Sequence, residues 1–240
     1  MSYADLVRLI IDNLEGGYYH PDMYTANPSM FARAAAEYQR SGETMYGLDR
    51  KNGAPGVTTA TEGGVKFWNL IDKYYTKHHA DTSYWNDKAD GKKADIPASV
   101  GVQLKKYATD IIQYLFNKYL QYFSEPVKQI VLNDPGLLLQ FFYATYNGSD
   151  NFKNWATVLN NAYNSGIKDV NKYWDLVQAE RRKKSSAVFT QGANILDRLR
   201  PQVQGRTVSN SGNGLLFGAL AVGGALLLLF FGKKKSKKRR

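Results

Sequence analysis

The sequence predicts a mainly α-helical protein with a small β-hairpin after its first helix and one membrane-spanning helix near its C-terminus. Three observations predict this. Apolar residues recur at helical spacing through most of the first 200 residues. A Gly- and Thr-rich stretch at 41–64 interrupts that pattern, and residues 214–232 carry no charged or polar side chain. We therefore expect a domain at 1–200, a linker at 201–213, the apolar helix at 214–232 and a polybasic tail at 233–240.

The first helix is expected to begin at a capping box formed by Ser2 and Asp5. The apolar residues that follow at helical spacing are Leu6, Val7, Ile10, Ile11 and Leu14. Gly16-Gly17 is a typical C-terminal stop, so Glu15 is predicted to lie in the last turn. Residues 18–30, which include two prolines, are expected to form a loop.

The rest of the domain is predicted to be helical except for two short strands and one irregular polar stretch at 79–97. The strands are expected near Thr44–Asp49 and Val57–Thr61. Val100–Phe123 is the strongest helix, because its apolar residues form one broad face. The other expected helices are Met30–Arg40, Val65–His78, 125–132, 136–146, 150–163, 168–182 and 186–199.

The segment 214–232 has the length of a membrane span. As a helix it would rise about 28 Å, close to the hydrocarbon core of about 30 Å. The tail at 233–240 has seven basic residues among its eight, which leaves residues 1–232 with 25 basic against 21 acidic side chains. We expect the apolar helix to contact a lipid bilayer, and the tail to contact anionic lipid headgroups or packaged DNA. The spacing of Ala219 and Gly223 permits close helix pairing, as in a homo-oligomer or with other virion proteins.

The topology of this anchor is open from the sequence. The N-terminus lacks a secretory signal, whereas the positive tail favours the cytoplasmic side. An internal virion membrane or a host inner membrane would accommodate both features.

Composition excludes some kinds of site. There are no cysteines, so disulfides and thiolate metal centres are excluded. His78 and His79 are adjacent, which does not place them on one face of a helix, and His20 is expected in a solvated loop. Neither a zinc-protease motif nor an Asp-rich calcium loop is present. We therefore predict no metal and no cofactor.

Glu15 is the first candidate for chemistry. A carboxylate at a helix C-terminus faces the negative end of the helix dipole, and partial burial would disfavour its charge further. Both effects raise its pKa, as a general acid for glycosidic cleavage requires. A second candidate is the run from Gly42 to Asp49, which could present Glu43 or Thr44 to a groove. Taken alone, each pattern is more typical of an ordinary feature: an exposed Glu at a helix end and a plain hairpin.

Together, the two segments resemble a known family. The sequence E-G-G-Y at 15–18, followed by G-E-T-x-Y-G-L at 42–48, is similar to the pattern of the glycoside hydrolase family 108 muramidases, phage-type enzymes of the lysozyme-like superfamily. Tyr84-Trp85 with Asp90, and the segment 142–148, resemble later parts of that family, so the likeness covers roughly residues 3–190. It departs from the family in the additional residues between the two motifs and in Ser41, where a second Gly is usual.

The resemblance implies an α+β lysozyme-like fold and a peptidoglycan-cleaving activity, without a cofactor. Glu15 would be the general acid, and Asp22 or Glu43 would position or activate water. Thr44, Tyr46 and Tyr18 would lie near the substrate. The outcome would be hydrolysis or, without a second carboxylate, lytic transglycosylation.

The biological role that this suggests is that of a phage virion component acting in cell-wall penetration or lysis. The alternative is a non-enzymatic structural virion membrane protein that retains the lysozyme-like fold. One further feature, the charge run Arg181–Lys184, is expected to be a solvated helix end.

Overall fold

A computed structural model describes residues 1–31, 42–51, 61–184 and 186–208. Residues Tyr3–Val208 belong to one compact unit, and the second unit consists almost entirely of residues outside the described ranges. The apolar segment 214–232 and the tail 233–240 lie outside those ranges. Among the described residues, no helix has the length and apolar character needed to cross a membrane.

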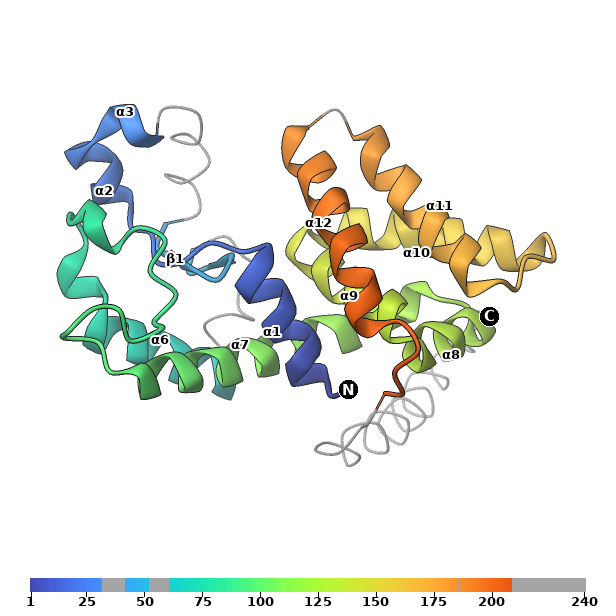
Figure 1. Ribbon diagram of the computed structural model, residues 1–240, viewed down its shortest axis with the longest axis horizontal. Helices are drawn as coiled ribbons and strands as arrows, with labels where there is room; N and C mark the ends of the chain where they lie inside the picture. The colour runs from blue at the N-terminus through green and yellow to red at the C-terminus, as the bar shows by residue number, and fades with distance from the viewer. Residues whose placement is uncertain (32–41, 52–60, 185, 209–240) are drawn as a thin grey trace, which may run out of the picture. The chain divides into compact units, whose positions relative to one another are not determined.

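The described chain is mainly helical and has one two-stranded hairpin (Figure 1). The N-terminal elements are α1 (Tyr3–Asn13), α2 (Pro21–Ala26), α3 (Pro28–Phe31), β1 (Thr44–Met45) and β2 (Leu48–Asp49). The middle elements are α6 (Glu62–Tyr74), the 3-10 helices η1 (Thr76–His78) and η2 (Thr82–Tyr84), α7 (Ala98–Tyr119) and η3 (Leu120–Tyr122). The C-terminal helices are α8 (Glu125–Asn133), α9 (Pro135–Tyr146), α10 (Ser149–Asn164), α11 (Val170–Lys183) and α12 (Ala187–Val203).

These elements confirm the predicted mainly helical class, with a small hairpin after the first helices. Every helix expected between residues 65 and 200 is present. Three local predictions were wrong. The expected loop at 18–30 contains α2 and α3, because each begins at a proline, which fits the first turn of a helix. The run 44–49 is not one strand but a complete hairpin, in which Thr44 pairs with Asp49.

The third correction concerns the expected linker at 201–213. α12 continues to Val203 with Pro201 in its last turn, because Val203 is fully buried and extends the packed face of the helix. The helix expected over Met30–Arg40 lies outside the described residues except for its first two positions, which belong to α3. The strand expected at Val57–Thr61 lies outside them except for Thr61, which caps α6.

The core forms around α7 and α9. α7 packs against α1, α6 and α9, and α9 also contacts α8, α10, α11 and α12. Residues 135–145 of α9 are buried on every side, as expected for a helix that is surrounded by others. Phenylalanine rings from α7, α9, α10 and the turn after η3 meet at centroid distances of about 5 Å. They are Phe116, Phe123, Phe141, Phe142 and Phe152.

Arg181 departs from the prediction of a solvated charge run. Its side chain is fully buried in α11, with the guanidinium carbon 4.1 Å from the ring centre of Trp155 and 4.9 Å from that of Tyr143. These aromatic faces stabilise the cation where no carboxylate pairs with it among the described residues. Burial lowers the pKa of Arg181. Only the residues after it form the solvated end that the sequence suggested.

Candidate active site

Glu15 lies directly after α1, where the chain leaves the helix. The N–H groups of Leu14 and Glu15 both donate to the carbonyl of Ile10, so the last turn continues to the candidate acid. Position 17 requires glycine because the backbone of Asn86 and Asp87 passes close to it. A Cβ atom on Gly17 would lie 2.3 Å from the carbonyl carbon of Asn86. The second glycine of the E-G-G-Y motif is therefore a steric requirement.

The hairpin turn meets the Glu15 carboxyl group. Met45 pairs with Leu48, which leaves Tyr46 and Gly47 as a two-residue turn with positive φ at both positions (56° and 71°). This is the type I′ geometry that suits a tight hairpin. A Cβ atom on Gly47 would lie 2.0 Å from Glu15 Oε2, so only glycine permits this approach.

The C-terminal turn of α9 also reaches the site. The ring of Tyr146 would lie 3.1 Å from a Cβ atom on Gly47. Burial raises the pKa values of Tyr143 and Tyr146, and the charge of Glu15 raises them further. The Tyr146 hydroxyl is buried and has no hydrogen-bond partner in the described structure. A buried hydroxyl left unpaired beside a candidate acid is an arrangement that functional sites often contain.

Glu15 titrates far above an ordinary carboxylic acid. Its residue surface is partly exposed, but its carboxyl group lies among the hairpin and the α9 tyrosines. Desolvation raises the pKa of Glu15, the charge of Lys88 lowers it and that of Asp49 on β2 raises it, and the net result is a pKa of about 8 instead of 4.5. At neutral pH the carboxyl group therefore carries its proton.

Lys88 links the end of α1 to the hairpin. Its ammonium group donates to the carbonyls of Ile11 (2.6 Å) and Asp12 (3.1 Å). Carbonyls in the last turn of a helix have no partner within the helix, and Lys88 supplies one. Its own carbonyl accepts a hydrogen bond from the Tyr46 hydroxyl at 2.8 Å. One residue thus stabilises both elements that border Glu15.

Glu43 forms a separate, buried network. Its Oε1 accepts hydrogen bonds from Tyr18 (2.8 Å) and Thr76 (2.7 Å), and its Oε2 pairs with Arg50 at 2.7 Å. Arg50 also binds both oxygens of Asp72 on α6. Both oxygens of Glu43 are engaged, and this arrangement suits a brace between the hairpin and α6 better than the activation of water.

Asp22 lies at the start of α2, beside two histidines. Its Oδ2 is 2.8 Å from His79 Nδ1 and 3.6 Å from His20 Nδ1. Nothing among the described contacts brings it to Glu15. Its predicted role in positioning water is not supported by this placement.

The residues expected to contact a substrate lie in the interior. Tyr18 and Tyr46 are fully buried, and Thr44 is nearly so. The backbone of Thr44 exchanges two hydrogen bonds of 2.9 Å with Tyr19, which joins the hairpin to the chain after Glu15. These three residues therefore pack beneath the site and do not form its surface.

Asp49, Lys88, Tyr143 and Tyr146 were not among the site residues predicted from the sequence. Asp49 closes the candidate run Gly42–Asp49, and both tyrosines belong to the segment at 142–148. Lys88 follows Trp85 in an irregular stretch, and no pattern marked it.

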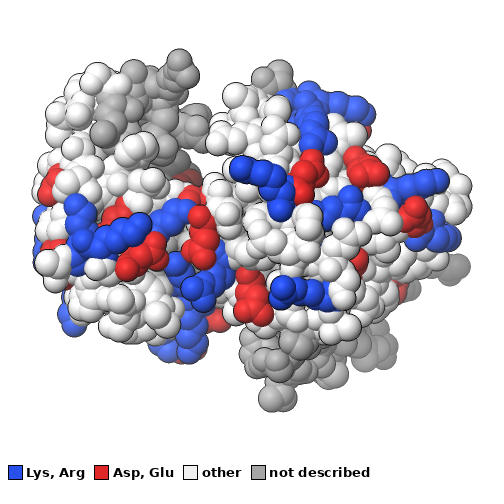
Figure 2. Space-filling view, in the orientation of Figure 1, with Lys and Arg blue, Asp and Glu red and all other residues white. Residues whose placement is uncertain are grey.

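Figure 1 places the hairpin beside the C-terminal end of α1, and Figure 2 shows that acidic and basic side chains are mixed on the same face of the molecule.

No protein-family model matches the sequence, and no curated protein or solved structure matches the chain. The likeness of the two motifs to the family 108 muramidases therefore stays a resemblance.

Proposed function

We propose that this chain is a lysozyme-like enzyme that cleaves the glycan strand of peptidoglycan, with Glu15 as its general acid. The observation that carries this proposal is the carboxyl group of Glu15, held against Gly47 with a pKa raised to about 8. A protonated carboxyl group at neutral pH is what glycosidic cleavage requires.

In this mechanism Glu15 gives its proton to the oxygen between N-acetylmuramic acid and N-acetylglucosamine. The bond to the anomeric carbon breaks, and positive charge develops on the sugar ring. The charge of Asp49 raises the pKa of Glu15, so we assign Asp49 the second role in preference to Asp22 and Glu43. It would stabilise the developing charge or hold the attacking water.

Two outcomes remain compatible with this site. If Asp49 holds water, the reaction is hydrolysis. If it does not, the ionised Glu15 takes the proton of the muramyl 6-hydroxyl, whose oxygen then attacks the anomeric carbon and closes an anhydro ring. The products of the second route are lighter by one water.

The test is digestion of purified peptidoglycan by the full-length chain, with mass spectrometry of the released muropeptides. Glu15→Gln should lower the rate by about 10²- to 10⁴-fold, the usual contribution of a general acid. Glu62→Gln, an exposed substitution on α6, is the control and should retain the wild-type rate. Full activity of Glu15→Gln would refute the assignment. An inactive wild type would favour the alternative, a structural virion membrane protein with this fold.

We further propose that residues 214–232 anchor the enzyme in a virion or host inner membrane, with the tail at 233–240 on anionic headgroups or DNA. The support is the sequence alone: nineteen apolar residues followed by seven basic ones among eight. The full-length chain should float with anionic vesicles in a density gradient, and a chain ending at Val208 should not. Equal flotation of the two would contradict the anchor.

A further inference from the structure

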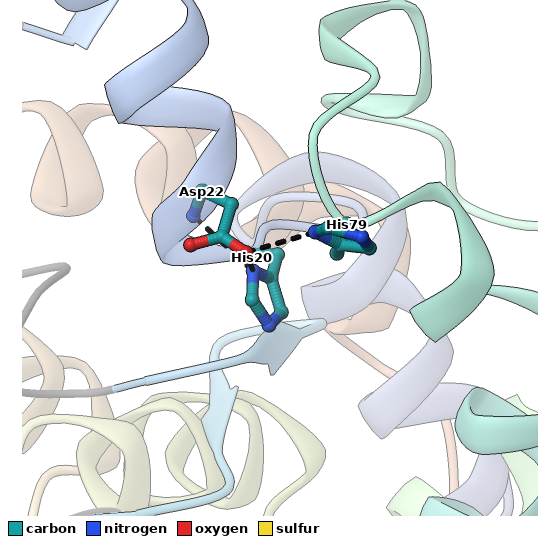
Figure 3. A group of neighbouring side chains, drawn as sticks. All are labelled: His20, Asp22 and His79. Atoms are coloured by element: carbon teal, nitrogen blue, oxygen red, sulfur yellow. Dashed lines mark hydrogen bonds and ion pairs between the residues drawn. The ribbon is translucent and has the colours of Figure 1, made fainter.

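A second group of functional side chains lies at the start of α2, apart from the Glu15 carboxyl group. It consists of His20, Asp22 and His79, and one ligand atom from each lies within 4.8 Å of the other two (Figure 3). The carboxylate of Asp22 lies toward both imidazole rings, at the two Oδ2 to Nδ1 distances given above. The three residues come from two segments that are far apart in sequence.

The first turn of α2 fixes the positions of His20 and Asp22 relative to each other. His20 is the N-cap of α2, and its Nδ1 accepts a hydrogen bond from the Asp22 N–H at 3.2 Å. This contact requires Nδ1 to be unprotonated, and an ion bound at Nδ1 would replace the Asp22 N–H as the partner of its lone pair.

His79 completes the group from the other segment. It caps the C-terminal end of η1, and its ring meets that of His20 edge-on at 5.5 Å between centroids. Its side chain is half exposed, so it can rotate toward an ion without disturbing the core.

We propose that His20, Asp22 and His79 bind one Zn²⁺ ion, with a fourth position open to water. Two imidazole nitrogens and one carboxylate are a usual zinc ligand set. Ligands at about 2.0–2.2 Å from a tetrahedral ion lie about 3.3–3.5 Å from one another. The present separations, from 2.8 Å to at most 4.8 Å, bracket that value.

The ion would join α2 to the turn after η1. Tyr18 and Tyr19 directly precede His20 in the chain. Each forms a single β-bridge, Tyr18 with Trp85 and Tyr19 with Thr44 of the hairpin. Zinc would therefore stabilise the segment that supports the hairpin. This proposal does not depend on the muramidase activity, and it makes Asp22 a metal ligand rather than a catalytic group.

The test is calorimetric titration of tag-free, full-length protein with zinc chloride, together with the visible spectrum of the cobalt form. The wild type should bind one equivalent and give the intense absorption of four-coordinate cobalt. His79→Ala and Asp22→Asn should each weaken binding on the order of 100-fold, at least as much as the loss of a supporting partner of a metal ligand.

His78→Gln is the matched control, because His78 adjoins His79 but pairs with Asp95 and stacks on Tyr84. It should bind zinc like the wild type. Circular dichroism of each variant verifies the fold. Equal affinity of His79→Ala and His78→Gln, or no stoichiometric binding by the folded wild type, would overturn the proposal.

Discussion

The stability of the Glu15→Gln variant should depend on pH in a way that reports the environment of this one side chain. Glu15 has an ordinary pKa of 4.5 when the chain is unfolded and a pKa of about 8 in the folded protein. Because the folded pKa is the higher one, ionisation penalises the fold. The penalty is absent below pH 4.5, grows as the pH rises, and is complete above pH 8.

The size of the penalty follows from these two values. At about 1.4 kcal/mol per pH unit, the raised pKa of Glu15 costs the folded state about 3 kcal/mol at pH 7 and about 5 kcal/mol at pH 9. These figures are ceilings, because a local opening that admits water reduces the penalty. The amide of Gln keeps the shape of the side chain and does not ionise. Glu15→Gln should therefore be more stable than the wild type by about 2–5 kcal/mol at pH 9, and equal to it within about 0.5 kcal/mol at pH 4.

Urea unfolding at several pH values measures this difference. Glu62→Gln is the control, because a hydrogen bond with Lys66 lowers the pKa of Glu62. Its carboxylate contributes stability that is present above its ordinary pKa and is lost in acid, so this substitution should act in the opposite direction and weakly. A Glu15→Gln difference that is flat between pH 4 and pH 9 would refute the reasoning.

Three further substitutions test the parts around Glu15. Gly47→Ala should lower activity by at least about 100-fold, because the new methyl group displaces the Glu15 carboxyl group. Gly166→Ala is the control: it has a similar positive φ but open space around it, and it should cost only about 1–2 kcal/mol of stability. Equal activity of the two variants would contradict the contact between Gly47 and Glu15. Lys88→Met should shift the alkaline limb of the pH–activity profile to higher pH, since the charge of Lys88 lowers the pKa of Glu15. It should also lower the stability of the fold by about 1–3 kcal/mol, because two carbonyls of α1 lose their partner. An alkaline limb at the wild-type pH would contradict the effect of Lys88 on Glu15. Glu43→Gln should lower the melting temperature but leave the position of that limb unchanged, and loss of activity at an unchanged melting temperature would instead restore Glu43 as a catalytic group.

Helical periodicity alone predicted most of the fold. The helices from α6 onward bury one face or are buried entirely, and such burial leaves a regular apolar pattern in the sequence. The short helices α2 and α3 left no such pattern: they have six and four residues, too few for a periodicity to be recognised. Their signal was the proline at the start of each, which was interpreted as a loop residue.

The candidate site was only partly predictable. The position of Glu15 at the end of a helix could be inferred from Gly16-Gly17, and the raised pKa that was expected is the one found. The partners of Glu43 could not be inferred, because Arg50 and Thr76 come from different elements and meet only in the folded chain. The same reason explains why His79 was set aside: the sequence showed its neighbour His78, but not the distant His20 and Asp22.

The most direct test of this account is the titration of the Glu15 carboxyl group in the full-length chain. Carbon-13 NMR of protein labelled at the glutamate side chains follows each carboxyl group through pH 3–10, and Glu15→Gln identifies the signal by its loss. The account predicts one glutamate with a midpoint near pH 8. A midpoint near 4.5 for Glu15 would show that it is ionised at neutral pH and is not the acid of a glycosidase.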